Sequence, residues 1–218
     1  MSEEQTQRLI AQLANDLTPV RRVPRLRSVA SGVLAVSAGV FAYAVSRSGV
    51  RADWWQLATS DASYAAVLVG LAVCGIGATL AALAGALPGR EAVFQRSGIA
   101  AGLGLAAAVA VGALSLGAQA DFGGSLSDDW MCLRAALQLS PLPIAAVLLA
   151  SSRGWVARPG LTAIAALAGA AGAGALSIHL ACGLVGARHF LLGHISAPVL
   201  LALVASLPAA LLLRRLAR

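Results

Sequence analysis

The sequence contains no lysine, and only 11% of its 218 residues are charged. A soluble domain usually carries about 25% charged residues. Hydrophobic residues make up 59% of the chain, more than a soluble core of this length could bury. The scarcity of charge therefore excludes an ordinary soluble domain and indicates that lipid surrounds much of the chain.

Several motifs of soluble chemistry are missing as well. The three cysteines, Cys74, Cys132 and Cys182, form no C-x-x-C pair, so neither a zinc knuckle nor a thioredoxin-type motif is present. The sequence also has no H-E-x-x-H motif, nucleophile elbow or phosphate-binding loop. We therefore expect a protein that is not an enzyme and uses no cofactor. The polar first 26 residues lack the apolar core of a signal peptide, so no cleaved leader is expected.

Six hydrophobic runs account for most of the chain. They cover residues 28–46, 62–87, 97–118, 131–150, 160–184 and 190–213. Each run is close to the ~20 residues that a helix needs to cross the hydrocarbon core, and a helix satisfies its own backbone hydrogen bonds in lipid. The sequence therefore predicts an all-α fold, a polytopic membrane protein built as a bundle of six transmembrane helices. Small residues in these runs favour close helix packing, with or without a dimer.

The arginines indicate the orientation of the bundle. With the N-terminus in the cytoplasm, 12 of the 16 arginines fall on the cytoplasmic side, and only Arg47, Arg51 and Arg188 fall outside. The remaining one, Arg134, lies within a predicted span. This asymmetry follows the positive-inside rule, so we predict that both termini are cytoplasmic. The chain then divides into a cytoplasmic tail at 1–27, a membrane domain at 28–213 and a basic C-terminus at 214–218.

The tail carries a helical pattern. Leu9 or Ile10, Leu13 and Leu17 recur at helical spacing among polar residues, and Pro19 then breaks the helix before the membrane. An amphipathic helix of this kind can lay its apolar face in a groove of a partner protein. It can equally lie on the membrane or on the bundle itself, and the pattern alone does not separate these interpretations. The arginines that follow are expected to anchor the tail to anionic lipid.

A second polar group is expected at the outer ends of the spans. In the predicted topology Cys132 opens the fourth span, Cys182 closes the fifth, and His179 shares a helix face with Cys182. His189 and His194 open the sixth span. Two thiols on an oxidising face can form a disulfide, and thiols with imidazoles can bind a soft metal ion. Alternatively, these side chains only pack or face solvent.

The order of these features resembles a known family. The run at 9–22, which ends in Asp-Leu-Thr-Pro-Val-Arg-Arg, resembles the N-terminal signature of the NrsF-type anti-sigma factors. Further similarities follow in order along nearly the whole chain, at Cys132, Arg153, Arg158-Pro159-Gly160, His179, Cys182, Gly193-His194 and Arg214-Arg215.

The resemblance implies a six-span protein of the bacterial inner membrane. Such proteins hold an extracytoplasmic-function sigma factor inactive through the cytoplasmic N-terminal segment and release it on a stress signal, without contacting nucleic acid. The pattern and the resemblance together assign the sigma-factor contact to Leu9, Leu13, Asp16, Leu17, Pro19, Val20, Arg21 and Arg22. They assign the sensor to Cys132, Cys182, His179 and His194.

Two other classes remain open from the residues. A small transporter or channel would need a polar path through the bundle, for which the spans offer little beyond Arg134. A redox enzyme of the quinone or disulfide-exchange type would need Cys132 and Cys182 to cycle between thiol and disulfide. The candidate inducing signals are an oxidant, a heavy metal and light-generated reactive oxygen.

Overall fold

The structure, a computed structural model, describes residues 3–15, 25–118 and 124–216. Within these ranges the chain forms helices joined by short connections and contains no strand. Six segments of the described chain are long and apolar enough to cross a membrane. The expected all-α class and the six-helix membrane bundle are therefore confirmed.

The helices follow the order of the predicted spans. The first half of the chain contains the tail helix α1 (Glu3–Asn15), α2 (Leu26–Ser48), the short α3 (Trp54–Ser60), α4 (Ala62–Gly85) and α5 (Glu91–Ala118). In the second half the fourth span consists of α6 (Leu126–Leu139) and α7 (Pro141–Ser151), and the fifth is α8 (Pro159–Ala181). The sixth is made of α9 (Ala187–His189), the π-helix η1 (Phe190–Ile195) and α10 (Ser196–Leu216).

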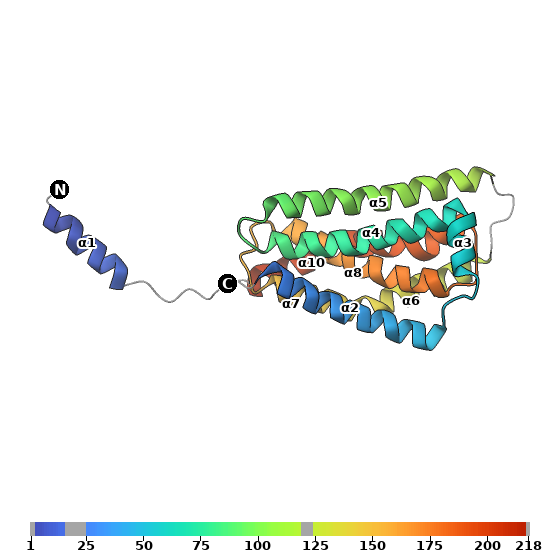
Figure 1. The fold of residues 1–218 in the computed structure, drawn as a ribbon, viewed down its shortest axis with the longest axis horizontal. Coiled ribbons are helices and arrows are strands. Elements are labelled where there is room, and N and C mark those ends of the chain that lie inside the picture. Colours follow the sequence, from blue (N-terminus) through green and yellow to red (C-terminus); the bar gives the residue numbers. More distant parts are fainter. Residues whose placement is uncertain (1–2, 16–24, 119–123, 217–218) are drawn as a thin grey trace.

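The bundle has two ends, which we name by their contents. Figure 1 shows that α2 begins and α10 ends at one end, the termini end. The opposite end, where α8 stops and α6 starts, carries Cys132 and Cys182 and is called the cysteine end. Each end has its own buried apolar cluster. Ala30, Leu83 and Val147 belong to the first cluster, and Tyr64, Leu133 and Phe190 to the second.

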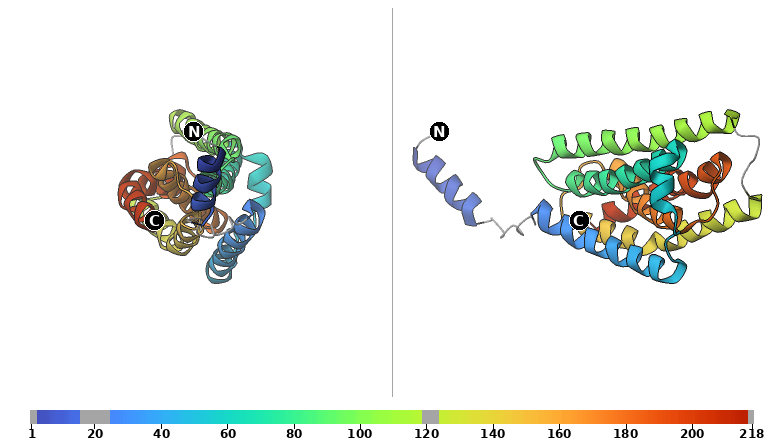
Figure 2. Two further views of the ribbon diagram at one scale, coloured as in Figure 1. Left: turned by 90° about the vertical axis from the view of Figure 1, so that its left-hand side faces the viewer. Right: turned by 45° about the vertical axis from the view of Figure 1, so that its right-hand side comes forward.

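Helices α4 and α8 form the centre of the bundle. They bury most of their residues, whereas the other four spans bury a third or less, and the end-on view in Figure 2 shows the other helices arranged around them. Glycine permits the close contact between these two helices. A Cβ atom on Gly169 of α8 would lie 2.6 Å from Oγ1 of Thr79 on α4. Such small residues let helix backbones pack closely where no hydrophobic effect separates helix from lipid.

The fourth span is broken where a single helix from 131 to 150 is expected. Pro141 lacks the backbone N–H that would continue α6, so a new helix starts there. Ser140 closes α6 by donating its hydroxyl to the carbonyl of Ala136 at 2.8 Å. The span also begins earlier than expected, at Leu126.

The tail helix is present as α1 and has no buried residue. In Figure 1 it stands away from the bundle, beyond the termini end. Its apolar side chains are exposed by 47% at Leu9, 57% at Ile10 and 59% at Leu13. The structure therefore leaves the apolar face of α1 available to a partner.

Candidate functional site

Four potential metal or redox ligands converge at the cysteine end. Cys132, Cys182, His189 and His194 each offer one ligand atom, and these atoms all lie within 4.8 Å of one another. We call these four residues the cysteine–histidine cluster. The two sulfur atoms are 3.6 Å apart, and neither thiol is in a disulfide.

Cys132 reaches the cluster because α6 begins with a strong cap. The side chain of Ser125 accepts a hydrogen bond from the backbone N–H of Asp128, and the Asp128 carboxylate accepts one from the Ser125 N–H at 2.7 Å. This capping box satisfies two backbone donors that a helix start would otherwise leave unpaired. Cys132 therefore lies inside the span, one to two turns after its start, and not at its opening.

Cys182 lies beyond the last helical residue of α8. It caps the helix with extended backbone angles, so its side chain does not continue the helical face of His179. The loop before α3 holds it in place, because the Arg51 guanidinium donates to the Cys182 carbonyl at 2.9 Å. The N–H of Arg51 also donates to the carbonyl of Leu180 at 3.0 Å. Contact with the Cys132 thiol lowers the pKa of Cys182 and burial raises it, with a net downward shift.

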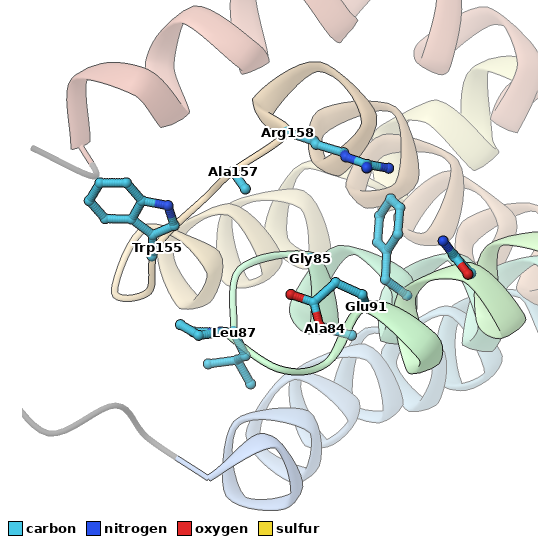
Figure 3. A pocket seen from close by; sticks show the side chains of 10 residues that line it. Ala84, Gly85, Leu87, Glu91, Trp155, Ala157 and Arg158 are labelled. Carbon is cyan, nitrogen blue, oxygen red and sulfur yellow. The ribbon is translucent and has the colours of Figure 1, made fainter.

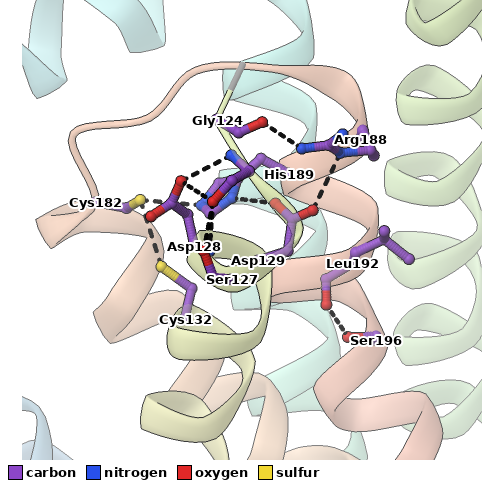
Figure 4. Close-up of polar contacts among 11 residues, drawn as sticks. Gly124, Ser127, Asp128, Asp129, Cys132, Cys182, Arg188, His189, Leu192 and Ser196 are labelled. Atoms are coloured by element: carbon purple, nitrogen blue, oxygen red, sulfur yellow. Dashed lines mark hydrogen bonds and ion pairs between the residues drawn. The ribbon is translucent and has the colours of Figure 1, made fainter. Parts of the chain in front are cut away.

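His189 joins a chain of polar contacts, drawn in Figure 4. Its Nε2 lies 3.1 Å from the sulfur of Cys182, and its Nδ1 lies 2.7 Å from Oδ1 of Asp129. The other carboxylate oxygen of Asp129 pairs with Nε of Arg188 at 3.1 Å. Because an ionised carboxylate can only accept, Nδ1 of His189 donates to Asp129, and in the neutral ring Nε2 keeps its lone pair facing the Cys182 sulfur. Asp129 is only 3% exposed, although it lies before the predicted span at 131–150.

His194 is fully buried and has no hydrogen-bond partner for either ring nitrogen among the described residues. Its ring centroid lies 5.0 Å from that of His189. Gly193 lets this turn approach α6, since a Cβ atom there would lie 3.3 Å from Cβ of Cys132.

His179, which the sequence interpretation grouped with the cysteines, lies outside the cluster. Its Nε2 is 3.3 Å from the carbonyl of Tyr64, and its ring stacks on the Tyr64 ring at a centroid distance of 4.3 Å. The ring of His179 nevertheless lies 5.1 Å from that of His194. His179 therefore packs between the cluster and the apolar core, and its predicted sensor role stays a prediction.

His189 and Asp129 are the site residues that the sequence interpretation left out. Ser125 with Asp128 three residues later is a capping-box signal, and it would have placed Asp129 in the first turn of a helix. His189 lies with His194 at the predicted start of the sixth span, but the predicted sensor included His194 and not His189.

The tail residues predicted to contact the sigma factor divide into two groups. Leu9 and Leu13 lie on α1 with their side chains exposed. The others lie outside the described residues, namely Asp16, Leu17, Pro19, Val20, Arg21 and Arg22.

Two concave surfaces lie away from the cluster. A pocket of about 270 Å³ at the termini end is lined by Glu91, Trp155 and Arg158, among others, and Figure 3 shows it between the α4–α5 turn and the loop before α8. A groove of about 530 Å³ along α5 and α10 is lined mostly by apolar side chains, including Ile99 and Leu203. The lining of this groove provides no polar path for a transported substrate.

Comparison with known proteins finds a match to one family. The family model for NrsF, described as negative regulator of sigma F, matches residues 13–216. No curated protein and no solved structure matches the chain. The matched range starts within α1 and contains the whole cysteine–histidine cluster.

Proposed function

The chain belongs to the family of negative regulators of sigma F, and we propose that it is a membrane-anchored anti-sigma factor for a sigma factor of the extracytoplasmic-function type. In this proposal the tail binds the sigma factor and blocks its access to core RNA polymerase. The observation that carries it is α1, an amphipathic helix with an exposed apolar face on a chain of six membrane helices.

The length of α1 favours a partner-bound helix. Isolated helices shorter than about 12–15 residues are marginal in water, and α1 has 13 residues. Burying Leu9, Ile10 and Leu13 in a groove of the sigma factor would stabilise the helix and contribute most of the apolar contact.

The charges of α1 favour a protein groove over a lipid surface. Helices that lie on membranes usually carry many basic residues on the polar face. The first turn of α1 instead carries Glu3 and Glu4, and Arg8 is its only basic residue. Anionic headgroups repel such carboxylates. A basic groove on the sigma factor would attract them.

The proposal places the termini end in the cytoplasm of a bacterial cell and the cysteine end outside the inner membrane. A sigma factor acts on cytoplasmic RNA polymerase, so its inhibitor must present α1 on that side. The excess of arginines assigned to the cytoplasmic side supports this orientation. An even number of spans also agrees with the start of α2 and the end of α10 lying at the same end of the bundle in Figure 1.

The signal enters, in this proposal, at Cys132 and Cys182. Helix α8 connects Cys182 with the termini end, where Ala163, Ala166 and Leu167 share an apolar cluster with Ala30 and Val33 of α2. The tail is attached to α2, whose buried residues are Ala30, Val33 and Ala44. Moving the sigma factor from almost fully bound to almost fully free requires about 5.5 kcal/mol of differential binding. A rearrangement of α8 against α2 is the proposed means of supplying it.

The test is co-purification of the full chain in detergent with the sigma factor encoded beside it. We expect the wild-type chain to retain the sigma factor and a chain lacking residues 1–24 to lose it. A Cys74→Ser variant is the matched control, because Cys74 is buried in α4 far from both proposed sites. Equal retention by the shortened chain would refute the tail as the binding element.

A further inference from the structure

The cysteine–histidine cluster has the composition of a metal site. We propose that Cys132, Cys182, His189 and His194 bind one divalent cation of the zinc class, with two thiolate and two imidazole ligands in a tetrahedron. The link from this ion to sigma-factor release rests on the function proposed above, whereas metal binding itself does not.

The spacing of the ligand atoms fits a single ion. Zinc–sulfur bonds of about 2.3 Å in a tetrahedron place two sulfurs about 3.8 Å apart. The sulfur atoms of Cys132 and Cys182 are 3.6 Å apart, and all four ligand atoms lie within 4.8 Å of one another. A disulfide would instead require the sulfurs to approach to about 2.05 Å. The observed separation therefore suits an ion held between the two sulfurs with little rearrangement.

His194 indicates that the cluster needs a ligand. Its side chain is completely buried at the cluster, and neither ring nitrogen has a hydrogen-bond partner among the described residues. Buried polar groups in proteins are normally paired, because an unpaired one keeps its desolvation cost without a compensating bond. A metal–nitrogen bond would satisfy one ring nitrogen of His194.

His189 has the outer-sphere partner typical of a metal-bound histidine. Metal-ligating imidazoles usually donate their second N–H to a carboxylate, which fixes the tautomer and the ring orientation. Asp129 accepts this bond from Nδ1 at 2.7 Å and is itself paired with Arg188 at 3.1 Å. Nε2 is thereby directed toward Cys182 with its lone pair available.

The π-helix η1 explains how two histidines five residues apart serve one ion. In an α-helix, residues five apart point about 140° away from each other. The i→i+5 bonding of a π-helix brings such residues close to the same side, and single π turns recur at functional sites. Here the rings of His189 and His194 lie 5.0 Å apart at the start of the sixth span.

Charge balance favours a divalent ion in this mostly apolar setting. Binding forms two metal–sulfur and two metal–nitrogen bonds in place of bonds from the ion to water. Two S–H bonds break, and the two protons pass to water. Two thiolates and one divalent cation have no net charge, so the occupied cluster carries the same charge as the two thiols and two neutral imidazoles. No oxidation or reduction is involved.

The test uses full-length protein purified in detergent under reducing conditions and loaded with cobalt(II) as a spectroscopic probe for zinc. We expect one cobalt per chain, with the intense visible absorption of a tetrahedral site and a thiolate-to-cobalt charge-transfer band. Zinc should displace the cobalt and remove both bands. The Cys132→Ser and His194→Ala variants should lose the tetrahedral spectrum, whereas Cys74→Ser should keep it.

Two further measurements extend the test, and the first uses only the wild-type chain, so it does not depend on the folding of a variant. Zinc should protect Cys132 and Cys182 of the wild-type chain from alkylation, and a chelator should restore their reactivity. Asp129→Asn, which keeps the side-chain shape, should weaken zinc binding by about 10- to 100-fold.

The proposal is overturned if the reduced wild-type chain takes up no cobalt. It is also overturned if His194→Ala keeps the wild-type spectrum, because the site would then not use His194. Neither readout involves the sigma factor, so failure here is separate from failure of the anti-sigma function.

Discussion

Replacing Leu13 with aspartate would test the docking face of α1 most directly. Leu13 lies on the apolar face of the helix and is 59% exposed when the helix has no partner. The substitution removes an apolar anchor and puts a carboxylate in its place. If the face docks in an apolar groove, that carboxylate must lose its water.

The expected loss of affinity can be estimated from the exposure of Leu13. Full burial of a leucine side chain is worth about 1.5–3 kcal/mol, so burying the exposed part of Leu13 contributes roughly 1–2 kcal/mol. Placing a carboxylate in the groove costs at least about 1–3 kcal/mol more. A total near 3 kcal/mol corresponds to an affinity about 100-fold weaker, since about 1.4 kcal/mol changes a dissociation constant tenfold.

The assay is a titration of the full chain in lipid nanodiscs with labelled sigma factor. Ala11→Asp is the matched control, because it adds the same charge to the same helix. Ala11 lies two residues before Leu13 and so about 160° around the helix, on the polar side. Replacing alanine with aspartate costs more helix propensity than replacing leucine with aspartate, about 0.7 kcal/mol at most, so the control overstates this part of the effect.

We expect Leu13→Asp to weaken binding about 100-fold and Ala11→Asp to weaken it by no more than about threefold, the part due to propensity. In cells the first variant should release the sigma factor without a signal, and a reporter of its target genes should rise. The reasoning is refuted if Leu13→Asp binds as tightly as the wild type. It is equally refuted if Ala11→Asp weakens binding as much as Leu13→Asp, because the apolar face would then have no special role.

Further predictions concern stability and orientation. Gly169→Val should lower the melting temperature in detergent, because its Cβ would lie 2.6 Å from Thr79 Oγ1, whereas Gly102→Ala, with no atom within 4 Å of its Cβ, should leave that temperature nearly unchanged. Asp61→Ala should destabilise the fold by about 1 kcal/mol, since the Asp61 carboxylate caps α4 by accepting from the N–H groups of Ser63 and Tyr64. Burial raises the pKa of Asp61, but the hydrogen bonds from Ser63 and Tyr64 lower it by more, so the net shift is downward. The stabilisation by Asp61 should therefore be complete above the ordinary aspartate pKa of 3.8 and should fade as the pH falls through the lower pKa of the folded state. Green fluorescent protein fused to the C-terminus should fluoresce in cells, because the proposal places that terminus in the cytoplasm. If this fusion is dark and a phosphatase fused at the same position is active outside the membrane, the proposed orientation is reversed.

The number and kind of the spans could be read from the sequence. An apolar run of about 20 residues has one stable solution in lipid, because only a helix pairs all of its own backbone groups there. The amphipathic pattern of the tail likewise predicted α1, since the 3.6-residue period is a local property. The breaks at Pro141 and in η1 were not predicted, because the apolar character of a span continues through a local change of helix type.

The candidate site depended more on tertiary structure. The sequence identified the two thiols and His194, and it grouped His179 with them by assuming that α8 continues through Cys182. Helix α8 ends at Ala181, so Cys182 turns toward His189 while His179 stays against Tyr64.

The sequence by itself thus determined what the chain is made of: six membrane helices, a short amphipathic tail, and a few thiols and imidazoles near helix ends. Only the packing of α6, α8 and the sixth span decided which of those side chains meet. The physical reason is the distance along the chain over which each effect acts. Hydrophobicity and helical period act within one segment, whereas the meeting of Cys132 with Cys182 depends on where separate helices end and how they pack together.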